Sequence, residues 1–170
     1  MAGDIAEQFG GDVSTAPIKG FERALAKALD GCNVNDLARN TIVVDAGSVD
    51  SAVDDLARAG ANVWEFTLDN NDLGYTGFNT TVVTESGLRA EIQVNTPEMI
   101  FAKEPEGIAR SILGDDAYDS LVVARGDVGG QGHKFYEQHR VLQPNDPEAL
   151  RIAQESRDYY AQFRQPAVTQ

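Results

Sequence analysis

Two short apolar runs in the first half of the chain have the pattern of buried strands. Residues 41–44 are a β-branched run, which favours an extended conformation in the interior of a sheet. Residues 62–68 return to this pattern and place Trp64, Phe66 and Leu68 on one face of a second strand. Both runs are short and bounded by polar or glycine residues, so they predict strands rather than helices.

Helical spacing fills most of the remaining chain. The apolar positions become helical from Pro17, and a further helix begins at Ser48 and ends at Gly60. The inner stripe of this further helix is expected to consist of Val49, Val53, Leu56 and Ala57. Residues 105–163 are mostly helical, in segments separated by glycines and by a Pro-Asn-Asp-Pro turn.

The alternation is clearest in residues 88–95, which follow a strand at 79–84 after a turn at Glu85-Ser86-Gly87. Apolar and polar residues take turns along this second strand: Leu88, Ala90, Ile92 and Val94 against Arg89, Glu91, Gln93 and Asn95. Successive side chains point to opposite faces of a sheet, so the first four are expected in the core and the second four on one polar face. Thr96-Pro97 then predicts a helix start.

The order of these elements predicts an α/β fold. We expect a mixed sheet of about four strands, flanked by helices and followed by a helical C-terminal part. The small and polar residues 1–15 are expected to be loosely ordered, and residues 16–170 to form a single domain.

Composition narrows the class of partners. The chain has 170 residues, with 14 Lys plus Arg against 27 Asp plus Glu, a net charge of −13. This acid excess argues against long nucleic acids and anionic membranes. A phosphorylated ligand is still compatible with it, because a local basic patch or a metal ion can override the overall charge.

Cysteine and hydropathy usage indicate a reducing compartment. Cys32 is the single cysteine, so a disulfide within the chain is excluded. The first residues lack the basic and apolar regions of a signal peptide, and no apolar run approaches the ~18 residues of a membrane span. A cytoplasmic location without membrane association is therefore expected.

Two groups of charged residues could carry chemistry. Lys19, Arg23 and Lys27 recur every four residues along one predicted helix, as a solvated face or as a clamp for phosphate groups. Asp36 and Glu91, at the entrance of the first strand and on the polar face of the last, could share one Mg²⁺ ion if their strands are neighbours. The alternative is that Glu91 and Gln93 are ordinary surface residues.

These residues lie within a resemblance to the RelA/SpoT synthetase family, from about Lys19 to Glu104. Gly74-Tyr75 followed by Asn79 and Val82 resembles the family's G-Y-x-x-x-H-x-x-V strand, and Glu91-Ile92-Gln93 resembles its E-I-Q-x-R-T strand. Asp36-Leu37, after the basic helix, is similar to the start of the family's D-L-x-x-x-R-x-x-V strand.

The resemblance implies a nucleotidyltransferase-like fold and an activity. Members transfer pyrophosphate from ATP to the 3′-hydroxyl of GDP or GTP, and so make the alarmone (p)ppGpp in a Mg²⁺-dependent reaction. It implies that Asp36 binds the metal and that Glu91 either assists the metal or acts as base. The resemblance further implies that the donor phosphates are bound by Lys19, Arg23 and Lys27. It implies that the acceptor is bound by Tyr75, Asn79 and Gln93.

Several positions depart from the family pattern. Asn79 stands where the family has histidine, and Asn95 and Thr41 stand where it has arginines. Arg39 and Arg89, together with Arg23, could compensate for the lost cations. These departures bear on guanosine specificity more than on the fold.

A second resemblance lies near the C-terminus. Residues 132–140 are similar to a Gly-His-x-x-Tyr-Glu-x-x-Arg helix of small RelA/SpoT-like proteins from phages and toxin systems. His133, Glu137 and Arg140 are spaced to share one helix face. This face could cap the donor site or pin the helix to the sheet, and we favour the second role.

The leading hypothesis is therefore a stand-alone nucleotide pyrophosphokinase of a toxin or phage type. One alternative is a catalytically impaired module with the same fold that binds nucleotides or a protein partner. Another is a toxin that modifies adenine nucleotides or the 3′ end of tRNA, although the net charge argues against tRNA. Small members of the family often form homo-oligomers, and the resemblance extends that expectation to this chain.

Overall fold

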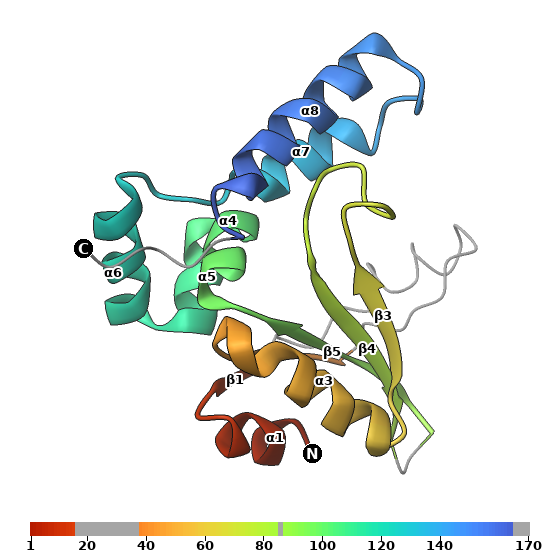
Figure 1. Cartoon of the computed structure of the whole chain (residues 1–170), viewed down its shortest axis with the longest axis vertical. Coiled ribbons are helices and arrows are strands. Elements are labelled where there is room, and N and C mark those ends of the chain that lie inside the picture. The colour runs from red at the N-terminus through yellow and green to blue at the C-terminus, as the bar shows by residue number, and fades with distance from the viewer. Residues whose placement is uncertain (16–37, 85–86, 165–170) are drawn as a thin grey trace. The chain divides into compact units, whose positions relative to one another are not determined.

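The computed structural model describes residues 1–15, 38–84 and 87–164. These residues belong to two compact units (Figure 1). The first unit comprises Met1–Glu65 with Phe78–Asn95, and the second comprises Phe66–Gly77 with Thr96–Gln170. The predicted single domain over residues 16–170 stays a prediction.

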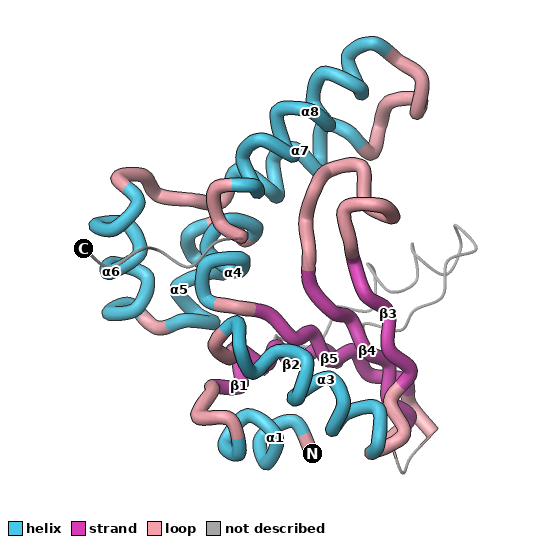
Figure 2. Tube along the Cα trace, viewed as in Figure 1, coloured by secondary structure: helices cyan, strands magenta, loops and turns pink. Residues whose placement is uncertain are grey.

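The first unit is built on a mixed sheet of five strands (Figure 2). The strands are β1 Asp12–Thr15, β2 Ala38–Val43, β3 Asn62–Phe66, β4 Gly77–Val83 and β5 Arg89–Asn95, in the spatial order β1-β2-β5-β4-β3. The central strands β2 and β5 are parallel, whereas β1 is antiparallel to β2 and β4 to β5. The predicted α/β class with a mixed sheet is confirmed, with one strand more than expected.

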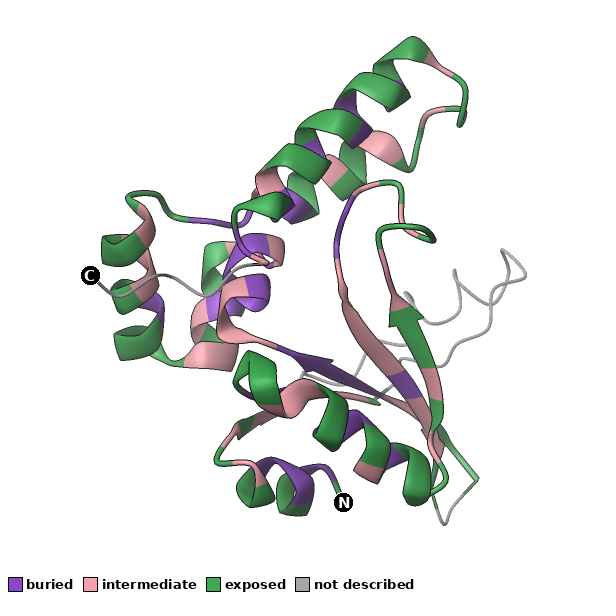
Figure 3. Ribbon diagram, in the orientation of Figure 1, coloured by how far each residue is buried: buried purple, intermediate pink, exposed green. Residues whose placement is uncertain are grey.

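One face of this sheet carries the hydrophobic core. Helices α1 (Ala2–Gln8) and α3 (Val49–Arg58), the latter preceded by the short 3₁₀ helix Ala46–Ser48, supply apolar side chains to it. Ile42 of β2 is buried in this core. The C-terminal half of β5 is buried (Figure 3). Ile92 and Val94 lie in the core, as the alternation along residues 88–95 predicts, whereas Leu88, predicted to join them, is 58% exposed. The predicted polar positions of that strand consequently lie on the opposite face.

The sequence gives little hint of the N-terminal elements. Residues 1–15, expected to be loosely ordered, instead form α1 and β1. Ala2, Ile5 and Ala6 are buried in the core cluster, so this short helix is held by packing rather than by intrinsic helix stability.

Two predicted inner faces are wrong in detail. In β3 the residue that packs on the core is Val63, whereas Trp64 is 60% exposed, because the strand has the opposite parity to the one expected. In α3 the inner stripe includes Ala52 and leaves Ala57 exposed, since Ala52 lies beside Val53 and Leu56 on the buried side.

The second unit is helical. Its helices are α4 Pro97–Lys103, α5 Glu106–Leu113, α6 Asp115–Arg125, α7 Gln131–His139 and α8 Pro147–Ala161. The predicted start at Thr96-Pro97 is confirmed, because the Thr96 hydroxyl accepts a hydrogen bond from Met99 N at 3.3 Å. Asp146 caps α8 in the same way, through Glu148 N at 2.8 Å.

Aromatic rings fill the interior of this unit. Phe101 lies 5.0 Å from Tyr118, and Tyr159 lies 4.9 Å from Phe163, between ring centroids. The Tyr159 hydroxyl donates a hydrogen bond to the Ala102 carbonyl at 3.1 Å. Burial raises the pKa of Tyr159 to about 12, which keeps this donor protonated across the physiological pH range.

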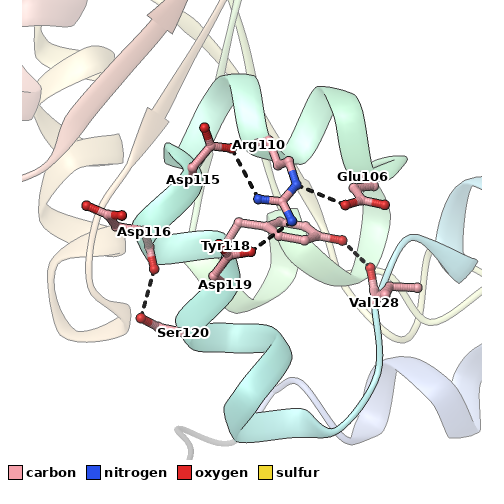
Figure 4. Close-up of polar contacts among 8 residues, drawn as sticks. All are labelled: Glu106, Arg110, Asp115, Asp116, Tyr118, Asp119, Ser120 and Val128. Carbon is pink, nitrogen blue, oxygen red and sulfur yellow. Dashed lines mark hydrogen bonds and ion pairs between the residues drawn. The ribbon is translucent and has the colours of Figure 1, made fainter.

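A charged cluster joins α5 to α6 (Figure 4). The Arg110 guanidinium forms ion pairs with Glu106, Asp115 and Asp119 at 2.8–3.1 Å and lies 4.3 Å from the centroid of the Tyr118 ring. Hydrogen bonds, first of all with Glu106, raise the pKa of Arg110 above its ordinary value. Because these groups satisfy one another, we assign the cluster to helix packing rather than to ligand binding.

Within the described ranges, the helices are too short or too polar to cross a membrane.

Candidate functional site

The polar face of the β2-β5-β4 strands brings several predicted site residues together. On β5 it carries Arg89, Glu91, Gln93 and Asn95. The strand register places Arg39 and Thr81 on either side of Glu91, and Thr41 and Asn79 on either side of Gln93. Directly opposed residues of neighbouring strands share a face. We call Arg39, Thr41, Asn79, Thr81, Glu91 and Gln93 the polar sheet face.

Glu91 is fixed within this face by its neighbour two positions along the strand. The Gln93 side-chain amide donates a hydrogen bond to Glu91 Oε1 at 2.8 Å. Gln93 is only 5% exposed, whereas Glu91 is half-buried. The alternative of ordinary surface residues therefore does not fit Gln93, which the structure places in the interior.

Asn79 presents an unusual atom to the same face. Its Oδ1 is buried, and in the described part of the chain it has no hydrogen-bond partner. A buried acceptor left without a donor costs about 1–3 kcal/mol. This position corresponds to the histidine of the resembled motif, so the departure leaves an acceptor oxygen where the family has an imidazole.

Two predicted accessory cations also lie on this side of the sheet. Arg39 is half-buried and in register with Glu91, whereas Arg89 is exposed at the beginning of β5. Glu91 accepts a hydrogen bond from Gln93. Residues 39 and 41 point to the same face, and compensation by Arg39 for the arginine missing at Thr41 stays a prediction.

The polar sheet face fits one half of a magnesium site. Mg²⁺ prefers oxygen ligands and is held in proteins by one or two carboxylates, and Glu91 supplies one such carboxylate. No group of three or more His, Cys, Asp or Glu residues that could hold a metal occurs among the residues that the structure describes. The other predicted ligand, Asp36, lies outside them, as do Lys19, Arg23 and Lys27.

Tyr75 lies in the second unit, and its ring is buried rather than free. The side chain is 8% exposed, and the ring contacts Phe66 at 5.6 Å and Tyr160 at 5.9 Å between centroids. The Lys103 ammonium group lies 5.2 Å from the ring centroid. Stacking on a nucleobase stays a prediction, and it requires one face of this ring to exchange its present neighbours for the base.

The loop before Tyr75 is held by side chains of α8 and of Arg164, which follows α8, and the sequence does not indicate this. Three consecutive carbonyl groups accept hydrogen bonds from side chains far along the chain: Asp72 O from Arg157 at 2.7 Å, Leu73 O from Ser156 at 2.8 Å and Gly74 O from Arg164 at 2.6 Å. The partners are 83 to 90 residues apart in sequence. This glycine-flanked loop is therefore anchored through its backbone.

We expect Arg157→Ala to loosen this loop. The variant removes the hydrogen bond to Asp72 O and the ion pair with Asp72 at 3.6 Å. Amide hydrogen exchange of residues 72–75 should accelerate about tenfold, equivalent to about 1.4 kcal/mol of local stability. Arg151→Ala is the matched control, since Arg151 on the same helix pairs with Glu148 and Glu155 of α8. Equal exchange in both variants would contradict the anchoring role.

The C-terminal motif separates into a packing residue and exposed residues. Gly132 is buried, and a Cβ atom there would lie 1.9 Å from Tyr160 Oη. His133, Glu137 and Arg140 are exposed, and Arg140 pairs with Glu137 at 2.9 Å. Their exposure does not support the favoured role of pinning the helix by this face, and contact with a ligand stays a prediction.

No family model matches the chain. It is 47% identical over 169 residues to the (p)ppApp synthetase toxin Tas1 of Pseudomonas aeruginosa (strain UCBPP-PA14), a match that covers 96% of this chain. The chain spans 38% of the length of that curated relative.

Solved structures are similar over most of the chain. The crystal structure of the complex between the type VI effector Tas1 and its immunity protein contains a chain that is 47% identical, with a TM-score of 0.89 over 96% of this chain and 87% of that chain. The small alarmone synthetase 2 of Bacillus subtilis is 16% identical, with a TM-score of 0.49 over 93% and 79% of the two chains.

Proposed function

This chain belongs to the RelA/SpoT-like synthetase family, and we propose that it transfers pyrophosphate from ATP to the 3′-hydroxyl of an adenine nucleotide. The observation that carries the proposal is the 47% identity over 96% of the chain to a protein named as a (p)ppApp synthetase toxin. The polar sheet face supports it, because it presents a held carboxylate beside cationic and amide side chains.

The proposed acceptor differs from the guanosine nucleotide that the sequence motifs favoured. The relative is named for (p)ppApp, the adenosine counterpart of (p)ppGpp. The changes at Thr41, Asn79 and Asn95 fit a change of acceptor, because all three residues lie on the strands β2, β4 and β5 that form the polar sheet face. We therefore place the adenine nucleotide first and the guanine nucleotide second.

The reaction forms one bond and breaks one. The acceptor 3′-oxygen attacks the β-phosphorus of ATP, and the bond from that phosphorus to the oxygen of the α-phosphate breaks, which releases AMP. Glu91 accepts the proton of the 3′-hydroxyl in this proposal, and Lys19, Arg23 and Lys27 hold the donor phosphates. Positioning and charge neutralisation supply most of the catalysis in such transfers.

We propose that a magnesium ion is bound by carboxylates of this chain. Glu91 and Asp36 would hold the ion. When bound, Mg²⁺ neutralises charge on the transferring phosphates. Asn79 would contribute to binding of the acceptor, and stacking of its base on Tyr75 stays a prediction.

The test is turnover with separate acceptors. The protein is incubated with ATP and Mg²⁺ and with either ADP or GDP, and nucleotides are separated by chromatography. The proposal predicts one AMP for each new nucleotide, formed at least about tenfold faster with ADP, which corresponds to a difference of about 1.4 kcal/mol. AMP without a new nucleotide would overturn transfer, and nucleotide binding without turnover would favour the catalytically impaired module.

We also propose a site of action and a protein partner. ATP and adenine nucleotides are cytoplasmic, so the chain would act in a cytoplasm. Tas1 was crystallised with its immunity protein, and we propose that a cognate immunity protein binds this chain too. A matching gene product that abolishes turnover when mixed in equimolar amount would support this, and unchanged turnover with such a product would contradict it.

A further inference from the structure

Gln93 differs from the other residues of the polar sheet face in what its side chain touches. It is 5% exposed, and its amide nitrogen donates a hydrogen bond to Glu91 Oε1 at 2.8 Å. It lies on the central strand β5, between Thr41 of β2 and Asn79 of β4. The side-chain amide of Gln93 thus has a partner within the protein, the carboxylate of Glu91.

The hydrogen bond from Gln93 fixes the orientation of the Glu91 carboxylate. The terminal torsion of a glutamate side chain is broad, so the carboxylate plane is not fixed by rotamer preference. Residues i and i+2 of a strand lie on the same face but are about 6.8 Å apart along it. The long glutamine side chain spans this separation, whereas an asparagine at position 93 would be one methylene shorter.

The Gln93 amide that donates this hydrogen bond carries no charge. An arginine or lysine as partner would place a full positive charge beside Glu91 and weaken its attraction for a proton or a cation. The Gln93 amide orients Oε1 without neutralising the carboxylate and leaves Oε2 unengaged by this bond. Arg39, although in register with Glu91, is not the group that holds it.

We infer that Gln93 is a positioning residue that acts through Glu91 and does not bind the acceptor. The inference rests on the proposed function for its catalytic consequence, but the hydrogen bond can be tested separately. Residues that orient a reacting or metal-binding group typically contribute 10- to 100-fold to activity.

The kinetic test replaces Gln93 by methionine, which keeps the volume and removes the donor. We expect kcat to fall about 10- to 100-fold, with the KM for the acceptor changed by less than about threefold. A rise in the acceptor KM with kcat unchanged would assign Gln93 to acceptor binding and overturn the inference. Thr80→Val is the matched control, because Thr80 is buried and bonds to Ile92 O at 3.0 Å on the opposite face of the same strand pair. It should leave kcat unchanged.

A double-mutant cycle isolates the route through Glu91. Glu91→Asp shortens the carboxylate side chain and withdraws it from Gln93, so adding Gln93→Met should then lower kcat by less than about threefold. Independent, multiplicative losses would overturn the inference.

NMR detects the hydrogen bond between Gln93 and Glu91 independently of enzymatic activity. The side-chain amide resonance of Gln93 should move in Glu91→Ala, and an unmoved resonance would overturn the inference. An inactive wild-type protein in which this resonance does move would contradict the proposed function alone.

Discussion

Glu91→Gln is expected to lower pyrophosphate transfer by at least about a thousandfold, with the fold unchanged. The substitution keeps the shape of the side chain and an oxygen that can accept the hydrogen bond from Gln93. It removes the negative charge and the basic oxygen that the proposed mechanism needs for the 3′-hydroxyl proton and for the cation. General-base catalysis alone contributes about 10²–10⁴-fold, and loss of a metal-binding carboxylate adds to this effect.

Steady-state production of AMP, together with thermal unfolding, measures this effect. The melting temperature should stay within about 2 °C of the wild-type value, because Glu91 is half-buried and the hydrogen bond from Gln93 is retained. Glu98→Gln serves as the control, since Glu98 is also acidic but lies in the first turn of α4. Wild-type turnover in Glu91→Gln would remove Glu91 from the chemistry.

Gly132→Ala is expected to produce the largest loss of stability. A Cβ atom built on Gly132 would lie 1.9 Å from Tyr160 Oη, 2.6 Å from Tyr160 Cζ and 3.1 Å from the Ala102 carbonyl oxygen. The Tyr160 ring packs against Tyr75 and Tyr159, so it has no free space into which to move. Overpacking of this kind costs about 3 kcal/mol, which lowers the melting temperature by roughly 6–12 °C in a chain of this size.

The glycine control is Gly107→Ala. Gly107 lies within α5, and a Cβ atom there would meet nothing within 4 Å. Alanine should therefore be neutral or stabilise the helix by about 0.5–1 kcal/mol. Adding Tyr160→Phe to Gly132→Ala removes the closest atom and should recover part of the lost stability. A melting temperature in Gly132→Ala equal to that of Gly107→Ala would contradict the close contact between α7 and α8.

Local patterns predicted the elements that local physics decides. Alternation over residues 88–95 identified β5, its buried Ile92 and Val94, and its polar face, because strand periodicity is a property of neighbouring residues. The cap at Thr96 was predictable for the same reason, since the hydroxyl and its partner are three residues apart.

Features that depend on distant residues were not predictable. Nothing in the alternation distinguishes a solvated polar face from one in which Gln93 is buried, because the period is the same in both cases. The burial of Tyr75 depends on Tyr160, and the anchoring of its loop depends on α8, so neither leaves a signal in the glycine-rich segment itself. Helix α1 is too short to show helical periodicity, although its alanines complete the core.

A net charge of −13 does not by itself exclude an anionic substrate, because the charges close to the binding site matter more than the total. On the polar sheet face, Glu91 is accompanied by Arg39 in register and by neutral amide and hydroxyl groups. An acidic chain can therefore bind a nucleotide where its own carboxylates are few and held, while its overall charge still disfavours long nucleic acids.

The most direct test follows the β-phosphorus of ATP. The protein is incubated with Mg²⁺, with ATP that carries 32P at the β-phosphorus and with unlabelled ADP as acceptor, and the products are separated by chromatography and located by their radioactivity. Pyrophosphate transfer predicts unlabelled AMP and an adenosine product whose 3′-diphosphate carries all of the label. Label that stays in ADP derived from the donor, or that appears only in free pyrophosphate, would contradict the proposed reaction.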